Sequence, residues 1–331
     1  PFYFLILHRA ADRVFNFSWR QRLDIFSAPK FVVEVLTPFI RVRQGEQVRL
    51  RLTNNSRDGV RDSIYIADSL GASDKKQFRL NHKGAQEADT LTLTWENGIP
   101  DGTFVVPVLI DKERVASVVA RKFDVQVDSL RPVGVISSFP TSPLVESLQR
   151  LGLTPGLYDA DSFNGVSPEQ ASVLFLDHRV LSLRSKLLSQ REILSEYVQQ
   201  GGHLVVLSQD ANVWNESKLW EGLRAERTNA LHPDCRVLQS DRTQLFQIPN
   251  KLSKETWQGW LFSLGSNRLF GADAKNDAVL LTALSGKGRF PLIVSRVMGS
   301  GRITYVDLDL HHQLLNLHEG AFRLLANLVS F

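Results

Sequence analysis

Residues 31–128 alternate apolar and polar side chains with a period of two, as half-buried β-strands do. The segments Phe31-Val32-Val33-Glu34-Val35 and Val48-Arg49-Leu50-Arg51-Leu52 show this pattern, and turn-forming clusters such as 54–59 separate the segments. Short strands at this spacing, with no helical pattern between them, predict an all-β domain of the immunoglobulin-like sandwich type. Residues 1–30 are interpreted as a leader or the tail of a preceding element.

From residue 133 onward, apolar strand-like runs alternate with helix-like segments. The strand-like runs are 133–136, 173–176, 203–207, 279–284, 292–297 and 303–310, and the helix-like segments are 143–151, 187–198 and 314–328. Alternation of this kind predicts a parallel sheet covered by helices. Gly299-Ser300-Gly301 joins two strand-like runs and predicts a hairpin. The sequence therefore predicts two domains, an immunoglobulin-like sandwich over 31–128 and a three-layer α/β domain over 129–331.

Composition is that of an ordinary globular protein: of 331 residues, 43% are hydrophobic and 22% are charged. No uninterrupted apolar run approaches the roughly 20 residues that a membrane helix needs, so no membrane span is expected. The net charge of +4 is scattered along the strands without a basic stripe, so nucleic acid is not an expected partner. Cys235 is the only cysteine, which excludes an internal disulfide. Because the chain begins at Pro1 in a strand-like run, we interpret it as a fragment or a processed product.

Polar side chains follow two of the predicted parallel strands. Asp177, His178 and Arg179 follow the run 173–176, and Ser208 and Asp210 follow the run 203–207. Since ligands of parallel sheets bind at the carboxyl ends of the strands, these residues are candidates for a ligand cleft. Trp214 is a further candidate for the same cleft, because an indole beside charged groups suits a sugar. Capping of helices and ordinary surface packing are the alternative interpretation.

The segment after residue 207 lacks the features of a catalytic elbow. A serine nucleophile needs a nearby base and a strained turn, usually flanked by glycine, whereas Ser208 lies between Leu207 and Gln209. A hydrolase using Asp177, His178, Ser208 and Asp210 therefore stays an alternative rather than the leading hypothesis.

Two clusters are weak candidates for a metal site. Asp307, Asp309 and His311 share one face of a predicted strand because they are two residues apart. Their alternative role is capping of the helix that follows. The tetrapeptide His232-Pro233-Asp234-Cys235 resembles part of a zinc motif but lies in a polar stretch, so a surface turn is the preferred interpretation. Trp257 and Trp260 are expected to anchor that polar stretch to the core.

Several segments, taken in order over roughly residues 30–331, carry a resemblance to a known family. They are Gly134-Val135-Ile136, Tyr197-Val198-Gln199-Gln200-Gly201-Gly202-His203-Leu204-Val205-Val206, Pro249-Asn250-Lys251-Leu252, Trp257-Gln258-Gly259-Trp260, Gly299-Ser300-Gly301-Arg302-Ile303-Thr304-Tyr305 and Phe322-Arg323-Leu324-Leu325-Ala326-Asn327-Leu328. This series resembles the C-terminal region of long bacterial PIG-L-like (LmbE-type) deacetylases. The resemblance implies a β-sandwich followed by a class I glutamine-amidotransferase-like, flavodoxin-like domain, here without the cysteine nucleophile.

The resemblance implies a non-catalytic accessory region that supports or targets a zinc-dependent N-acetyl-sugar deacetylase. Under this interpretation the chain holds no cofactor itself, since the zinc belongs to a catalytic domain upstream in the same polypeptide. That domain is one expected partner and a polysaccharide is another. A pure protein-interaction scaffold is a further alternative. The resemblance also implies a periplasmic or extracellular location, with a cytoplasmic one left open.

Overall fold

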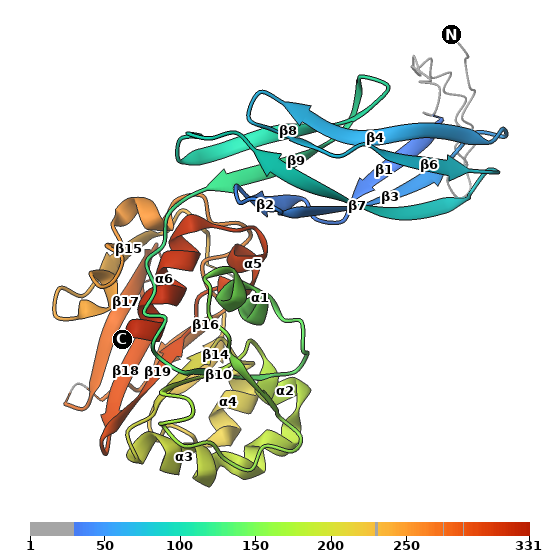
Figure 1. The fold of residues 1–331 in the computed structure, drawn as a ribbon. Helices are drawn as coiled ribbons and strands as arrows, with labels where there is room; N and C mark the ends of the chain where they lie inside the picture. Colours follow the sequence, from blue (N-terminus) through green and yellow to red (C-terminus); the bar gives the residue numbers. More distant parts are fainter. Residues whose placement is uncertain (1–29, 229–230, 274, 287) are drawn as a thin grey trace, which may run out of the picture. The chain divides into compact units, whose positions relative to one another are not determined.

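The computed structural model describes residues 30–228, 231–273, 275–286 and 288–331 (Figure 1). Contacts divide the chain into one unit that ends at Lys122 and a second unit, Phe123–Phe331. The boundary expected from the sequence lay slightly later, between residues 128 and 129. Residues 1–29 of the expected leader lie outside the described residues. Each helix in the described part is too short or too polar to cross a membrane.

The first unit consists of β-strands. They are β1 (Phe31–Val35), β2 (Phe39–Arg41), β3 (Gln47–Asn54), β4 (Val60–Asp68), β5 (Gly71–Ser73), β6 (Lys76–Leu80), β7 (Gln86–Trp95), β8 (Gly102–Ile110) and β9 (Glu113–Lys122). The predicted period of two is visible in their burial; β3, for example, buries Val48, Leu50 and Leu52 and exposes Gln47, Arg49 and Arg51.

The prediction of an immunoglobulin-like sandwich is wrong, because these strands form one continuous sheet. Its order is β1-β3-β7-β5-β4-β8-β9-β2, with β6 paired to β4. The short strand β5 pairs with β4 on one side and with β7 on the other, and so joins what would be two separate sheets. A Cβ at Gly71 would lie 2.8 Å from the Thr94 carbonyl oxygen, so glycine permits this close pairing. The sheet curls around a single apolar core that includes Ile64 and Leu91.

The second unit mixes strands and helices. Its strands are β10 (Val133–Ser137), β11 (Gly156–Asp159), β12 (Val173–Leu176), β13 (His203–Leu207), β14 (Arg224–Arg227), β15 (Arg236–Gln239), β16 (Asn267–Phe270), β17 (Asp277–Ser285), β18 (Gly288–Met298) and β19 (Gly301–Val306). Its α-helices are α1 (Pro143–Arg150), α2 (Val180–Leu183), α3 (Arg191–Gln199), α4 (Ala211–Ser217), α5 (Leu310–Leu315) and α6 (Glu319–Ser330). Three 3-10 turns complete it: η1 (Ser185–Gln190), η2 (Gln244–Phe246) and η3 (Lys254–Trp257).

The prediction of a flavodoxin-like, amidotransferase-like domain is also wrong, because the main sheet is mixed. Its order is β11-β10-β12-β13-β19-β18-β17-β15, and the pairs beyond β19 are antiparallel. The Gly299–Gly301 hairpin forms between β18 and β19 and reverses the chain direction there. Over the whole described chain, strand residues outnumber helical ones. The fold is therefore mostly β, with a separate two-stranded β14–β16 sheet beside the main one.

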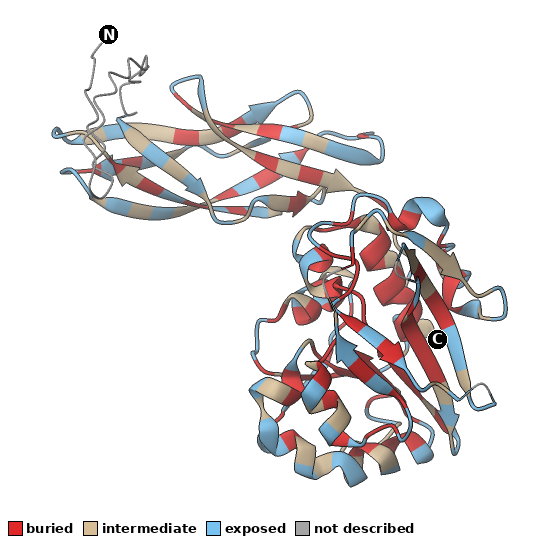
Figure 2. Cartoon of the chain, turned by 180° about the vertical axis from the view of Figure 1, so that it is seen from behind, coloured by how far each residue is buried: buried red, intermediate tan, exposed pale blue. Residues whose placement is uncertain are grey.

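Buried apolar side chains fix the helices of the second unit to its sheet. Tyr197 and Val198 of α3 pack against Leu204 of β13 and Ile303 of β19. Figure 2 shows buried residues concentrated on the central strands and along α6. The strand ends that follow these buried segments are consequently held in place by a rigid core.

Candidate functional site

The carboxyl ends of β12, β13 and β19 lie next to one another, because β13 pairs in parallel with both of the other strands. A cavity of about 400 Å³ opens at this edge. His178, Arg179, Ser208 and Asp210 line it, as does Asp309 from the segment after β19. Four of the six cleft candidates from the sequence are therefore brought together. The volume falls within the range of about 300–1,000 Å³ that is typical of small-ligand sites.

Two of the cleft candidates do not line this cavity. Trp214 is a core residue: its indole is buried, packs edge-on against Tyr305, and donates a hydrogen bond to the Leu223 carbonyl oxygen. Asp177 is buried and accepts hydrogen bonds from the Ser137 hydroxyl (2.8 Å) and the His178 backbone amide (2.7 Å). Both residues therefore belong to the packing beneath the cavity rather than to its lining.

Arg179 and Asp210 form an ion pair at the cavity wall. The Arg179 Nη2 lies 3.0 Å from the Asp210 carboxylate, and the Ser182 hydroxyl donates to the same carboxylate at 2.5 Å. Burial raises the pKa of Asp210, but the bonds from Ser182 and Arg179 outweigh it, so the pKa lies below its ordinary value. Arg179 has left-handed backbone geometry, with φ of 55°. The pair thus offers a fixed negative and a fixed positive group to a ligand.

A second carboxylate of the cavity is paired with an imidazole. The Asp309 Oδ1 lies 2.7 Å from His312 Nδ1, and the Ser263 hydroxyl donates to Asp309 Oδ2 at 3.0 Å. This pairing leaves the His312 Nε2 for a ligand. The neighbouring rings of His178 and His311 lie 5.1 Å apart. Burial first, and then the charge of His311, lower the pKa of His178 to about 4, so this imidazole is neutral at pH 7.

Ser208 is fixed by a buried carboxylate. Its hydroxyl donates to Asp307 Oδ1 at 2.8 Å, and Asn267 donates to the same carboxylate from both its backbone and its side chain. Burial raises the pKa of Asp307 to about 7, although these hydrogen bonds act in the opposite direction. Gln209 points into the protein, where its amide bonds Asp177, Leu207 and Leu181. At the strand end, the Ser208 hydroxyl is therefore held in place by its bond to Asp307.

The three weak metal candidates, Asp307, Asp309 and His311, each contact a different set of neighbours. Asp307 is held by Ser208 and Asn267, Asp309 by His312 and Ser263, and His311 by ring contacts with the other histidines. Among the described residues, no group of three or more His, Cys, Asp or Glu side chains is arranged to hold a metal ion. The tetrapeptide around His232 and Asp234 forms an exposed turn.

A turn at residues 261–263 completes the cavity and was not predicted from the sequence. The Ser263 amide donates to the Leu261 carbonyl oxygen at 2.9 Å, which closes a three-residue turn centred on Phe262. Phe262 has φ of 65° and its side chain is exposed (73%), 4.9 Å from the His312 ring. Trp257 and Trp260, which are buried and in mutual contact, anchor the preceding segment as expected. Three aromatic residues close together in the sequence, Trp257, Trp260 and Phe262, are the feature from which this part of the site could have been predicted.

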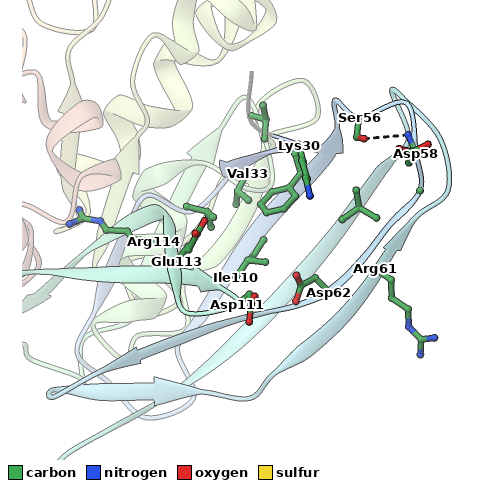
Figure 3. A pocket seen from close by; sticks show the side chains of 15 residues that line it. Lys30, Val33, Ser56, Asp58, Arg61, Asp62, Ile110, Asp111, Glu113 and Arg114 are labelled. Carbon is green, nitrogen blue, oxygen red and sulfur yellow. Dashed lines mark hydrogen bonds between the residues drawn. The ribbon is translucent and has the colours of Figure 1, made fainter. Parts of the chain in front are cut away.

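A larger hollow of about 970 Å³ lies in the first unit (Figure 3). Charged residues line it, among them Lys30 just before β1, Asp62 of β4 and Glu113 of β9. Figure 3 shows Arg61 and Arg114 pointing away from one another, so the charged groups do not converge on one point. The cavity of the second unit is therefore the better candidate site.

The chain is similar to solved structures at low sequence identity. No family model matches the chain, and no curated protein matches it. An exo-β-1,4-mannosidase from Opitutaceae bacterium strain TAV5 shares 15% identity and a TM-score of 0.35 over 61% of this chain and 35% of its own. A cold-adapted β-galactosidase from Rahnella sp. R3 shares 13% identity and a TM-score of 0.37 over 59% of this chain and 31% of its own.

The chain spans about a third of the length of these enzymes, and TM-scores this low carry no inference about its function. Because the sheet topology differs from the expected one and no family model matches the chain, the amidotransferase-like and deacetylase assignments made from the sequence are unsupported.

Proposed function

We propose that the second unit is a non-catalytic carbohydrate-binding region that supports or targets a carbohydrate-active catalytic domain. The observation that carries this proposal is the exposed ring of Phe262 at the mouth of a polar cavity. A non-glycine residue in left-handed geometry is strained, and an exposed phenyl ring gains nothing from burial. Such a residue persists where its ring has a ligand to contact.

The chemistry of the cavity suits a sugar. A pyranose has an apolar C–H face that packs on an aromatic ring, and its hydroxyl groups both donate and accept hydrogen bonds. Around Phe262 the cavity offers carboxylate acceptors at Asp210, guanidinium donors at Arg179 and an imidazole at His312. Small-ligand sites combine apolar or aromatic surface with a few convergent polar groups, and Phe262 provides the aromatic surface here.

Binding without catalysis is the simpler interpretation of the same contacts. Ser208 has a buried carboxylate rather than an imidazole as its partner, and it is itself buried. Nucleophilic catalysis needs the hydroxyl within reach of a base and exposed to the substrate.

The proposal is tested by isothermal titration calorimetry of the chain against neutral, amino and acidic trisaccharides. We expect at least one class to bind, and Phe262→Ala to weaken binding about tenfold or more. Phe139→Ala is the matched control, because Phe139 is also exposed (57%) in the second unit and does not line the cavity. Absence of binding by every class, or equal affinity in the two variants, would contradict the proposal.

Acid–base catalysis by His312 is a second candidate function. The observation that favours it is the 2.7 Å contact between Asp309 and His312, since a carboxylate on one ring nitrogen orients the other as a base. Hydrolysis of a chromogenic glycoside or ester that is lost in His312→Gln but retained in His232→Gln would support it. If the unmodified chain hydrolyses neither substrate and His312→Gln only weakens sugar binding, the function of His312 is in binding.

A further inference from the structure

Arg227 is a charged side chain of the cavity for which the described residues provide no partner. It lies at the end of β14 and lines the cavity together with Arg179, Asp210 and Asp309. The other three are already engaged: Arg179 with Asp210, and Asp309 with His312 and Ser263. An incoming anionic group would therefore meet Arg227 without displacing an existing bond.

Strand pairing places the Arg227 side chain on the cavity side of the small sheet. In the antiparallel β14–β16 pair, Arg227 is directly opposite Asn267. Residues directly opposite one another point to the same face of a sheet. The Asn267 side chain is buried and bonds Asp307 and the Gln209 carbonyl oxygen, so this face looks into the site. Ala225, two residues before Arg227 and on the same face, is also buried.

The neighbours of Arg227 suit an anion that has a saccharide attached. Ser266 also lines the cavity, and its hydroxyl has no partner among the described residues. A guanidinium group binds a carboxylate through two parallel N–H bonds, and a serine hydroxyl adds a third donor. The ring of Phe262 lies in the same cavity and provides the surface for the sugar ring.

From this arrangement we infer that the cavity binds acidic saccharides, with the carboxylate of a uronic acid residue on Arg227. This inference rests on the proposed carbohydrate-binding function and specifies its ligand class. Neutral sugars lack the group that Arg227 holds and bind more weakly, because they cannot form the bidentate ion pair with its guanidinium.

The test compares two ligands that differ in their carboxylates alone. Calorimetry at low ionic strength is performed with α-1,4-linked trigalacturonate and with α-1,4-linked galactotriose. The unmodified chain is expected to bind the acidic ligand at least tenfold more tightly. Arg227→Gln is expected to lose about ten- to a hundredfold of that affinity, as for one charge-assisted bidentate contact, and to bind the neutral ligand as before.

Arg224→Gln is the matched control, because Arg224 is exposed on the same strand but does not line the cavity. Arg227→Lys keeps the charge without the planar fork and is expected to fall between Arg227→Gln and the unmodified chain. Urea titration of each variant checks that its stability equals that of Arg224→Gln.

The outcomes separate this inference from the proposed function. Equal affinity for both ligands, or identical behaviour of the two glutamine variants, would overturn the inference while carbohydrate binding stands. Failure of both ligands and of every other trisaccharide would overturn the inference together with the proposed function. Competition by millimolar inorganic phosphate with the same loss in Arg227→Gln, but without any effect of Phe262→Ala, would replace the saccharide by a simple anion.

Discussion

The side-chain amide of Gln313 binds both backbone groups of Leu261. Its Nε2 donates to the Leu261 carbonyl oxygen at 2.8 Å, and its Oε1 accepts from the Leu261 amide at 3.0 Å. Gln313 is fully buried in α5, whereas Leu261 is the first residue of the turn that exposes Phe262. A buried amide in the core therefore fixes the position of an exposed ring at the cavity.

Replacing Gln313 by leucine is expected to destabilise the second unit and loosen the turn. Leucine keeps much of the volume but removes the partner of the Leu261 amide and leaves the Leu261 carbonyl oxygen with the Ser263 amide alone, at a cost of about 1–3 kcal/mol. Urea denaturation measures the loss of stability, and the trisaccharide titration measures the accompanying loss of affinity. Gln200→Leu is the control, because Gln200 bonds only Glu196 at the surface and is expected to change neither quantity. Equal stability of the two variants would contradict this role of Gln313.

Phe262→Gly is expected to be more stable than Phe262→Ala by about 1 kcal/mol. Glycine adopts the left-handed conformation of residue 262 without the steric cost that any Cβ carries. At Phe139, which has no positive φ, the order of the two substitutions should reverse, because glycine there only adds freedom to the unfolded chain. Thermal denaturation of the four variants provides the comparison. If alanine were the better residue at both positions, the turn would not be strained.

The polar ends of β12 and β13 could be predicted from the sequence because each directly follows a short, continuous apolar run. A buried parallel strand has this pattern, and neighbouring parallel strands end at one edge. His178, Arg179, Ser208 and Asp210 could therefore be assigned to one cleft from the sequence alone. Trp214 could not, because the same spacing fits an indole that lines the cleft and one that faces the core.

The remaining parts of the site depend on contacts between distant segments. Arg227 faces the cavity only because β14 pairs with β16, and neither strand has a period that sets it apart from the surrounding polar stretch. The continuous sheet of the first unit depends on β5, which is three residues long, shorter than any pattern that periodicity can detect. The sandwich prediction failed at this point.

Asp309 is expected to fix the tautomer of His312. A carboxylate accepts but does not donate, so the contact at 2.7 Å places the neutral ring's proton on Nδ1. Long-range ¹H–¹⁵N correlation spectra at pH 8 should show His312 protonated at Nδ1. Asp309→Ala should shift it toward the Nε2-protonated form, whereas Asp210→Ala, which removes the partner of Arg179, should leave it unchanged. A ring already protonated at Nε2 in the unmodified chain would contradict the pairing.

Asp307 is expected to make the protein less stable as the pH rises from about 4 to 7. Burial raises its pKa to about 7 in the folded chain from an ordinary value of 3.8, so the folded state holds a proton that the unfolded state has lost. In that window this carboxyl group lowers the free energy of unfolding by about 1.4 kcal/mol per pH unit. Asp307→Asn keeps the shape but cannot titrate, so the stability of the unmodified chain relative to this variant should fall across the window. A constant difference between the two chains would show that the hydrogen bonds from Ser208 and Asn267 keep the carboxylate ionised.

His203 is expected to affect stability in the opposite direction to Asp307, because it makes the protein less stable as the pH falls. It is buried between strands with Nε2 at 2.9 Å from the Thr304 hydroxyl, and its Nδ1 has no partner. Burial first, and then the charge of Arg302, lower the pKa of His203 to about 3 from an ordinary 6.5. Below pH 6.5, His203 binds a proton in the unfolded chain but not in the folded chain. The stability that this group contributes is therefore complete above pH 6.5 and is lost as the pH falls.

His203→Leu removes this acid-sensitive group while the Thr304 hydroxyl keeps its other partner, Ser295, at 3.0 Å. Between pH 6 and 4, the free energy of unfolding of this variant should fall less steeply than that of the unmodified chain, by about 1.4 kcal/mol per pH unit. Urea titrations at each pH measure the two slopes. His232→Leu serves as the matched control, because it makes the same substitution at an exposed histidine. Parallel slopes for His203→Leu and the unmodified chain would mean that His203 gains its proton without unfolding.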